Sequence, residues 1–389
     1  MKKILFVVRG YNPEISASGN LVKPLIEYLK LHAQVSVLCF TKSNSKCGTG
    51  IIDGIQVHRV MAPKIGYFER VMSIISRNLS RSTENVKLSN IMQKAIVELD
   101  ERERFDFVIA ITYEEVMALC RANIEKNRKF CFLLEKLSEP AKLKFIKKLQ
   151  SNYNLKKIQY ISKSVSKVFC LPIVKSVYDS AKLDFFELEH PMVVDRSYHT
   201  SHKTHSKRIK LIYAGGLSKH QRNPMALVRL IQQLNCKIGV DLDIYSYGFE
   251  FNEKFVKKTS DNIRLNKTVE PKVLNSKIND ADFIVTIGNK EVDIFPSKLF
   301  DCVSTGKPII HFFQNSKDQY LSYLQKYPLS MSVDYNKCEN AETFDAILKF
   351  LTDIKGERLP FHLVSRNFFD CTPGYVGDLM LREIEACQD

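Results

Sequence analysis

The chain has 389 residues, of which 44% are hydrophobic and 26% are charged. This balance excludes an intrinsically disordered protein, and 15 glycines and 13 prolines without a repeat exclude a fibrous one. Lysine and arginine outnumber aspartate and glutamate by 58 to 43, so the formal net charge is +15.

Short apolar segments that predict strands alternate with amphipathic segments that predict helices. Most of the strand candidates are continuously apolar, which is typical of a parallel sheet covered on both faces. The predicted strands are residues 4–8, 35–40, 56–60, 107–111, 130–134, 168–171, 210–213, 242–245, 283–287 and 308–312. The clearest helical patterns are residues 20–31, 86–99, 224–234 and 297–304. This alternation predicts a doubly wound α/β fold.

The composition changes at residues 195–207 (DRSYHTSHKTHSK), which are polar and lack apolar periodicity. We interpret residues 196–207 as a linker between two Rossmann-like domains, residues 1–195 and 208–360. The remaining segment, 361–389, ends in a helical pattern and contains no further strand candidate.

The longest apolar runs, of about five residues, are too short for a membrane span of roughly 20 residues. Arg9 also interrupts the first apolar run before a secretory leader could form, so we expect a cytoplasmic protein. The ten cysteines form no CxxC pair and stand mostly in apolar segments. They are therefore predicted to be reduced core residues rather than zinc ligands or disulfides.

The positive charge is concentrated between Arg121 and Cys170, where 13 basic residues stand against three acidic ones. Such a segment attracts phosphorylated ligands, anionic lipid headgroups or nucleic acid, although it could also be an ordinary solvated face. Nucleic acid is disfavoured because tryptophan is absent and no aromatic–basic motif accompanies the charge.

Ligands of parallel sheets bind beyond the carboxyl ends of the strands, so the loops after strands are informative. The first such loop, residues 9–19 (RGYNPEISASG), contains Gly10 and Gly19 and precedes a helix expected to start near Asn20. It is not a GxGxxG fingerprint, and an ordinary connection between strand and helix explains it equally well.

The second loop, residues 214–224 (AGGLSKHQRNP), combines Gly215 and Gly216 with the cations Lys219 and Arg222. Two glycines leave room for a ligand beside the backbone, and the cations precede a predicted helix start. A diphosphate fits this combination.

The third loop, within residues 288–308, is the most informative. Pro296 is expected to open a helix with Ser297 and Lys298 in its first turn, and Gly306 to end it. Asp293 precedes this helix and Asp301 lies on it. The two carboxylates can accept hydrogen bonds from hydroxyl groups of a ligand, while the helix N-terminus between them binds an anionic group. A nucleotide-sugar carries both kinds of group.

The segments AGGLSKHQRNP and DIFPSKLFDCVSTGKPII resemble the carboxyl-terminal half of retaining glycosyltransferases with the GT-B fold, in the large bacterial family four group. KKILFVVRGYNPEISASGNLVKPLIEYL and LEHPMVVD are similar to that family's opening segment and to the segment before its linker. The resemblance covers most of the chain. It implies two Rossmann-like domains that face a central cleft, with the acceptor in the first, the donor in the second and a terminal helix that crosses back.

The resemblance also implies residue roles. Two family glutamates, one on the transferred sugar and one on the ribose, match Asp293 and Asp301. The family's phosphate-binding arginine corresponds to Gly216, and its lysine is matched best by Lys219 or Arg222. Lys298 could replace the missing cation. Glu139, or Glu135 close to it, is the nearest match for an acidic residue that orients the acceptor or the reacting sugar. The implied catalytic set is Asp293, Glu139, Lys219 and Arg222.

A member of this family would transfer a sugar from a nucleoside-diphosphate sugar, with UDP favoured, to a saccharide or lipid-linked saccharide, without a metal ion or other cofactor. Capsule, exopolysaccharide or lipopolysaccharide synthesis on the inner face of the cell membrane would suit the basic segment. A nucleotide-sugar 2-epimerase and a non-catalytic binding partner with the same fold are the alternatives. The sequence sets neither the donor, acceptor and linkage nor the oligomeric state.

Overall fold

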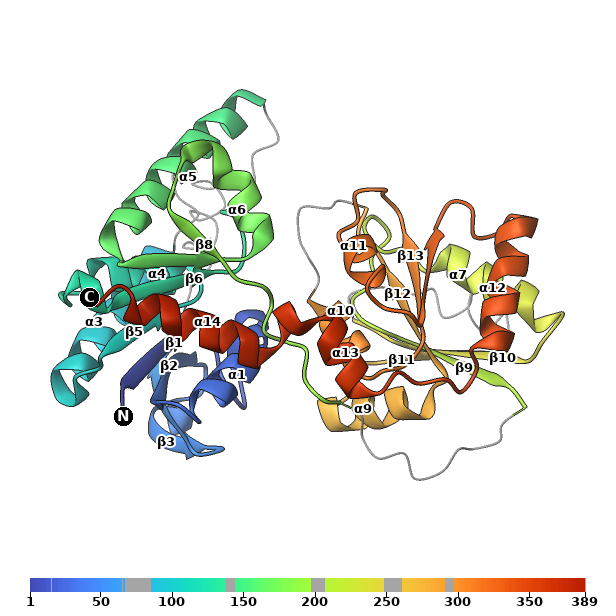
Figure 1. Ribbon diagram of the computed structural model, residues 1–389, viewed down its shortest axis with the longest axis horizontal. Coiled ribbons are helices and arrows are strands. Elements are labelled where there is room, and N and C mark those ends of the chain that lie inside the picture. The colour runs from blue at the N-terminus through green and yellow to red at the C-terminus, as the bar shows by residue number, and fades with distance from the viewer. Residues whose placement is uncertain are drawn as a thin grey trace. The chain divides into compact units, whose positions relative to one another are not determined.

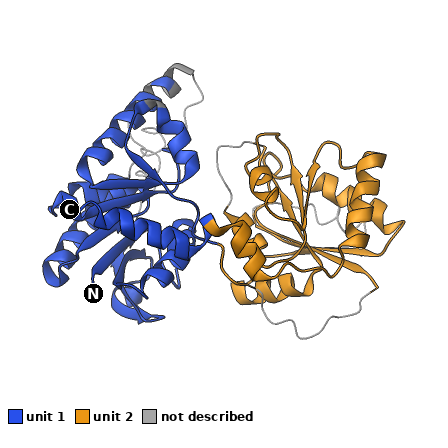
Figure 2. Cartoon of the chain, in the orientation of Figure 1, with its two compact units in different colours: residues 1–192, 370–389 blue, residues 193–369 orange. Residues whose placement is uncertain are grey.

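The computed structural model describes residues 1–14, 16–64, 66, 85–137, 144–196, 207–247, 261–290 and 297–388. The chain divides into two compact units, each built from strands and helices (Figure 2). Unit 1 comprises Met1–Met192 and Asp370–Asp389, and unit 2 comprises Val193–Phe369.

Unit 1 contains an eight-stranded sheet in the order β3-β4-β2-β1-β5-β6-β7-β8 (Figure 1). Its strands are β1 (Lys3–Val8), β2 (Gln34–Thr41), β3 (Gly48–Ile52), β4 (Ile55–Met61), β5 (Phe107–Ala110), β6 (Lys129–Leu133), β7 (Lys167–Cys170) and β8 (Phe185–Glu187). All neighbouring strands are parallel except the β3–β4 hairpin. The central strands β1, β5 and β6 are buried almost throughout, as the continuous apolar runs predict.

The helices of unit 1 are α1 (Ala17–Leu29), α3 (Val86–Glu103), α4 (Tyr113–Arg121), α5 (Lys144–Ser164), α6 (Pro172–Tyr178) and α14 (Pro373–Glu385). The carboxyl-terminal helix α14 packs against α1, where the Tyr28 hydroxyl donates a hydrogen bond of 2.6 Å to Asp378 Oδ1. No helix among the described residues is both long and apolar enough to cross a membrane.

Helix α1 begins three residues before the predicted start, which corrects the interpretation of the first loop. The Ser16 side chain accepts a hydrogen bond from Gly19 N at 3.0 Å and so caps the helix. Gly19 and Asn20 therefore belong to the first turn of α1, and only Gly10 remains in the loop. A Cβ at position 19 would lie 2.0 Å from Gly10 O, so this glycine allows a close approach of two backbone segments.

Unit 2 contains a six-stranded sheet in the order β11-β10-β9-β12-β13-β14, and every neighbouring pair is parallel. Its strands are β9 (Ile209–Ala214), β10 (Val240–Tyr245), β11 (Ile263–Asn266), β12 (Phe283–Ile287), β13 (Ile309–Phe313) and β14 (Ser330–Asp334). Its helices are α7 (Met225–Asn235), α9 (Pro271–Asp280), α10 (Lys298–Val303), α11 (Tyr320–Leu324), α12 (Ala341–Asp353) and α13 (Phe361–Asn367). Apolar side chains of β9, β10, β12, α7 and α12 form its core.

Each sheet has a switch point, where connections leave two adjacent strands in opposite directions. In unit 1 the chain proceeds from β1 to β2 on one side and continues from β5 to β6 on the other. In unit 2 the corresponding strands are β9 and β12. Ligands of open parallel sheets bind beyond the carboxyl ends of the strands at such points, so a ligand site is expected at one or both of these places.

The end of α10 depends on a glycine. Gly306 has a φ of +74°, and its carbonyl accepts a hydrogen bond from Leu359 N at 2.8 Å. A Cβ at this position would lie 2.2 Å from the Leu359 carbonyl oxygen, a backbone atom that a side-chain rotation cannot move away. Gly306, the residue predicted to end the helix, is therefore required for two reasons. Its φ is positive, and a side chain at this position would not fit beside Leu359.

We predict that Gly306→Ala lowers the free energy of unfolding by more than Gly356→Ala does. Both glycines have positive φ, but a Cβ at Gly356 would meet nothing within 4 Å. Left-handed backbone costs an L-residue roughly 1–2 kcal/mol in both variants. The clash at position 306 adds about 1–3 kcal/mol. Denaturant unfolding of the two variants checks this difference, and equal losses would contradict it.

Candidate anion site in unit 2

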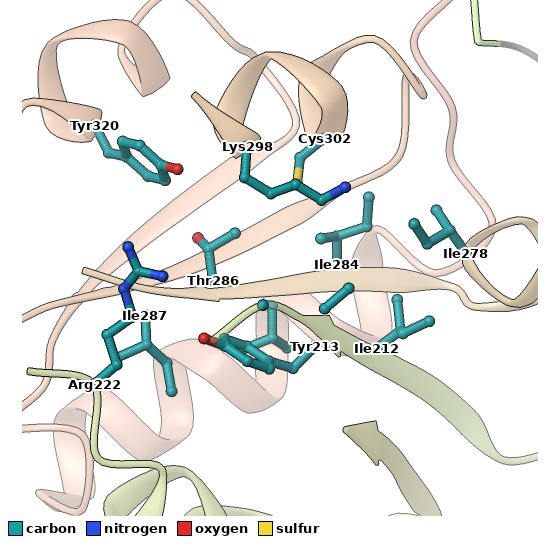
Figure 3. Close-up of a pocket in the computed structure, with 13 residues that line it drawn as sticks. Ile212, Tyr213, Arg222, Ile278, Ile284, Thr286, Ile287, Lys298, Cys302 and Tyr320 are labelled. Atoms are coloured by element: carbon teal, nitrogen blue, oxygen red, sulfur yellow. The ribbon is translucent and has the colours of Figure 1, made fainter. Parts of the chain in front are cut away.

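A pocket lies at the switch point of the unit 2 sheet, beside the carboxyl ends of β9 and β12 (Figure 3). Its floor is apolar and includes Ile212 and Ile284, whereas Arg222 and Lys298 supply two cations from different segments of the chain. Thr286 and Tyr320 add hydroxyl-bearing side chains to the wall. A mostly apolar pocket with a few convergent polar groups is the usual form of a small-molecule site.

Arg222 reaches this pocket because the loop after β9 folds back on itself. Ser218 and Arg222 exchange two backbone hydrogen bonds of 3.1 Å each, which close the loop. The Arg222 Nε donates a hydrogen bond of 2.7 Å to Asn289 Oδ1. Because Nε is held in this way, the outer nitrogens of the guanidinium face the pocket in Figure 3. This orientation allows a forked contact with a phosphate or carboxylate.

Tyr213, on β9, forms a hydrogen bond with the same loop. Burial raises the pKa of Tyr213 to about 12, although the nearby Arg222 guanidinium acts in the opposite direction. The neutral phenol donates a hydrogen bond of 2.9 Å to Gly216 O. Gly216, the second glycine after β9, is therefore held by a side chain of β9 itself.

Lys298 is the first residue of α10, and it is shared between the pocket and an ion-pair cluster. Its Nζ lies 3.0 Å from Asp301 Oδ2, and Arg196 Nη2 lies 2.6 Å from Asp301 Oδ1. Lys298, Arg196 and Asp301 line a second pocket, which shares Ile278, Ile284 and Cys302 with the first. One carboxylate thus stands between two cations, next to the wall formed by Lys298.

Four of the predicted site residues that the structure describes line one or both of the two pockets. Gly215, Arg222 and Lys298 line the first pocket, and Asp301 lines the adjoining one. Ser297 precedes α10 at its N-cap, but its side chain makes no capping hydrogen bond. A Cβ at Gly216 would lie 3.2 Å from the Tyr247 ring.

Other predicted site residues do not line this pocket. Lys219 is exposed and is not among the residues that line either pocket. Gly10, Gly19 and Asn20 belong to unit 1. Asp293, Pro296 and Glu139 lie outside the described residues, and Glu135 follows β6 in unit 1.

Among the residues of the two pockets and their supports that sequence reasoning missed are Thr286, Tyr320, Asn289 and Arg196. The only available signal for Thr286 is a hydroxyl within an otherwise apolar strand. Arg196 stands at the start of the polar linker segment, where a charged residue is unremarkable by pattern alone. Their importance comes from tertiary contacts that sequence spacing does not encode.

The switch point of unit 1 carries a different cluster. Arg9 follows β1, and its Nε donates a hydrogen bond of 2.7 Å to Glu115 Oε1 while its Nη2 donates one of 2.6 Å to Glu114 Oε2. Glu115 is fully buried and also accepts a hydrogen bond from the Thr112 hydroxyl. The cation at this position is therefore already neutralised by carboxylates of α4.

The cysteines are mostly buried, and the described residues form no cluster of metal ligands. Seven of the ten cysteines are buried and all ten are free thiols, which confirms the core prediction for those seven; Cys47 and Cys236 are exposed and Cys387 is partly exposed. Within the described ranges, no group of three or more His, Cys, Asp or Glu side chains could hold a metal ion.

No protein-family model matches the chain, and no curated protein is similar to it at a significant level. Solved structures are similar over its whole length at low identity. HepE from Anabaena in complex with UDP and glucose is 11% identical, with a TM-score of 0.59, and the match covers 99% of this chain and 100% of that one.

Two further structures extend the comparison. An α,α-trehalose-phosphate synthase (UDP-forming) from Burkholderia xenovorans in complex with glucose-6-phosphate is 10% identical, with a TM-score of 0.66 and coverage of 99% and 100%. Sucrose-phosphate synthase from Thermosynechococcus elongatus is 10% identical, with a TM-score of 0.61 and coverage of 100% and 96%. Together with the two parallel sheets, these similarities establish the GT-B fold.

Lys307, within the segment that carries the resemblance, has a structural role. It is 8% exposed, and its Nζ donates hydrogen bonds to the carbonyl oxygens of Asn279 and Ala281. Burial lowers the pKa of Lys307 from 10.5 to about 8, and the Arg358 guanidinium contributes in the same direction. The charged form is thus disfavoured in the folded chain.

We predict that this lysine makes stability rise with pH between about 8 and 10.5. In that range the unfolded chain keeps the proton of Lys307 and the folded chain releases it, so raising the pH favours folding, by at most about 1.4 kcal/mol per pH unit. Lys307→Met should remove this contribution, and the exposed control Lys237→Met should keep it. Denaturant unfolding at several pH values measures both slopes, and equal slopes in the two variants would contradict the prediction.

Proposed function

We propose that the chain is a glycosyltransferase that moves a sugar from a nucleoside-diphosphate sugar to a saccharide or lipid-linked saccharide. The observation that carries this proposal is the pair of cations, Arg222 and Lys298, on one pocket at the switch point of a GT-B donor-type sheet. The motif resemblance of the same two loops to retaining transferases supports retention of anomeric configuration.

The pocket suits a diphosphate better than a neutral ligand. Arg222 offers a planar fork of donors, and Lys298 offers a point charge at the start of α10. Gly215 leaves the backbone accessible beside them. As the glycosidic bond breaks, negative charge gathers on the leaving diphosphate, and cations already held in place stabilise that charge. The reaction then needs electrostatic stabilisation more than a strong base.

Asp301 and Asp293 complete the proposed donor site. Asp301 would accept hydrogen bonds from the ribose hydroxyls, and Asp293, in the segment outside the described residues, would hold the transferred sugar. Asp301 is paired with Arg196 and Lys298, so ribose binding would share its oxygens with these cations. Glu139 would orient the acceptor or the reacting sugar from the first half of the chain.

The donor is proposed to be a UDP-sugar. HepE was solved with UDP-glucose as well as with UDP and glucose, and a trehalose-6-phosphate structure from E. coli contains UDP-2-fluoro glucose. Lipid-linked acceptors at the inner face of the membrane, in capsule, exopolysaccharide or lipopolysaccharide synthesis, agree with the basic segment of unit 1.

We predict that UDP-sugars raise the unfolding temperature and that Arg222→Gln and Lys298→Gln weaken this effect. A ligand at about a hundredfold over its Kd stabilises the fold by roughly 2.7 kcal/mol. Loss of one hydrogen bond to a charged group costs about 1.5–3 kcal/mol, which is roughly a 10- to 100-fold increase in Kd. Lys237→Gln, which removes an exposed cation of unit 2 that lines neither pocket, is the matched control.

A thermal-shift panel of UDP-, GDP- and ADP-sugars measures these effects. If the ligand raises the unfolding temperature equally in all three variants, the placement of the diphosphate is contradicted. If no nucleotide-sugar raises the unfolding temperature of the wild type, the proposed function is contradicted. Product analysis with donor alone separates the transferase from an epimerase, because an epimerase converts the donor without an acceptor.

We further propose that α5 binds an anionic membrane surface. Lys148, Lys156, Tyr160 and Lys163 are exposed, and their spacing places them within about 120° of the helix circumference. Each lysine near an anionic surface contributes about 1 kcal/mol to binding. An interfacial tyrosine beside lysines is also typical of surfaces that lie on lipid headgroups.

We predict that replacing Lys148, Lys156 and Lys163 with glutamine lowers partition onto vesicles containing phosphatidylglycerol on the order of a hundredfold at low salt. The control variant replaces Lys237, Lys267 and Lys272, three exposed lysines of unit 2, and removes the same net charge. Vesicle co-sedimentation compares the two. If both triple variants lose binding equally, net charge rather than α5 is responsible.

A further inference from the structure

A chain of three buried side chains leads away from the pocket wall. Thr286 on β12 lies opposite His311 on the neighbouring strand β13, and its hydroxyl is 2.9 Å from His311 Nδ1. His311 is fully buried, and Thr286 lines the pocket beside Arg222 and Lys298. Two described pocket residues, Thr286 and Tyr320, contact the imidazole, and the hydrogen bond to it involves the Thr286 hydroxyl.

Asp318 stands behind the imidazole. Its Oδ2 lies 3.3 Å from His311 Nε2, within the distance of an ion pair, and among the described residues neither atom makes a hydrogen bond. Its Oδ1 accepts a hydrogen bond of 3.0 Å from Tyr320 N. A Cβ at position 288 would lie 1.9 Å from Oδ2, so Gly288 leaves the space that this carboxylate occupies.

The groups that face His311 set the positions of its protons. In the described part of the chain they are Thr286 from β12, Asp318 from the segment before α11, and the Tyr320 ring, whose centroid is 5.0 Å away. A carboxylate beside Nε2 favours a proton on that nitrogen. Nδ1 of the neutral ring is then an acceptor, and the Thr286 hydroxyl donates to it.

This arrangement conflicts with binding of an anion by Thr286. A hydroxyl that donates to Nδ1 turns its lone pairs toward the pocket, and lone pairs repel a phosphate oxygen. If the hydroxyl rotates to donate to the phosphate, its oxygen can accept a hydrogen bond only from a protonated Nδ1. His311 must then carry protons on both nitrogens.

We propose that binding of a diphosphate in this pocket is coupled to uptake of one proton by His311, with Thr286 as the group that links the two. The proton comes from solvent, and the product is an imidazolium paired with the Asp318 carboxylate. Thr286 contacts the ligand, whereas His311 and Asp318 are positioning residues. The inference rests on the proposed function, because it assigns the diphosphate to this pocket.

Linkage gives the direction of the pH effect. Uptake of a proton on binding means that affinity falls as the pH rises, by at most tenfold per pH unit. The same linkage means that the ligand favours the imidazolium form of His311.

Calorimetric titration with UDP-glucose at about pH 8, in buffers of different ionisation enthalpy, measures the proton uptake. UDP-glucose is suitable because its diphosphate diester has no titration near neutral pH. We expect uptake of up to one proton for the wild type and for Thr286→Ser. Thr286→Val, which has nearly the same shape but no hydroxyl, should lose the uptake and bind roughly tenfold more weakly. Binding without uptake in the wild type, or equal uptake in Thr286→Val, overturns the proposal.

A second measurement does not depend on the nucleotide. Nitrogen NMR of labelled histidine, with the His311 signals assigned by their loss in His311→Gln, should show the Nε2–H tautomer in the free chain and both nitrogens protonated with inorganic pyrophosphate. An Nδ1–H tautomer in the free chain overturns the coupling. If pyrophosphate binds and UDP-glucose does not, the nucleotide-sugar function fails while these signals still decide the coupling. Absence of binding by either ligand overturns both.

Discussion

The site depends on one constraint, the divergence of the connections at β9 and β12 in a sheet that is buried on both faces. Parallel strands in such a sheet must be joined by crossovers, and crossovers that leave adjacent strands in opposite directions cannot cover the strand ends between them. In unit 2 this uncovered edge lies between Ala214 and Ile287. Arg222, Thr286 and Lys298 reach the same pocket because each stands on or beside one of the segments that border this edge.

The cations at this edge need partners that hold them without neutralising them. Arg222 is fixed through Nε by the amide of Asn289, which carries no charge. Lys298 shares a single carboxylate, Asp301, with Arg196. Both arrangements restrict side-chain motion and leave positive charge for a ligand, so less conformational entropy is lost on binding. Because one carboxylate, Asp301, is shared by two cations, a net positive charge remains for an anionic ligand. A separate carboxylate for each cation would cancel that charge.

Much of the fold can be predicted from the sequence, because continuous apolar segments identify central strands. All ten predicted strands are present to within two residues of their observed ends. Four of the described strands, β3, β8, β11 and β14, escape this reasoning. They are edge strands that are partly exposed, and their sequences (GTGII, FFE, IRLN and SMSVD) lack an apolar run of four residues. The early start of α1 was missed because the Ser16 cap lies among other small polar residues that are equally good candidates.

The site is less predictable, because its residues are related by register and close approach rather than by spacing. Arg222 and Lys298 stand in loops that follow strands, where sequence reasoning searches. By contrast, Thr286 and His311 meet through the pairing of β12 with β13, and Asp318 fits only because position 288 has no side chain. None of these contacts leaves a pattern in the local sequence, although the apolar runs identify β12 and β13 as strands.

Comparison of the two switch points favours unit 2 over unit 1 for the proposed anion site. Both sheets have the same local topology, and both place an arginine beside the first strand, Arg9 after β1 and Arg222 after β9. In unit 1 the carboxylates of Glu114 and Glu115 occupy the guanidinium, and Glu115 is fully buried, so an incoming anion would have to displace a charge that cannot reach water. Among the described residues of unit 2, the side chain that accepts the Arg222 Nε hydrogen bond is a neutral amide. An arginine in the loop after the first strand is therefore closed in an ion pair in unit 1, whereas in the described part of unit 2 it is held by a neutral group, and the difference comes from the residue that faces the arginine rather than from the strand order.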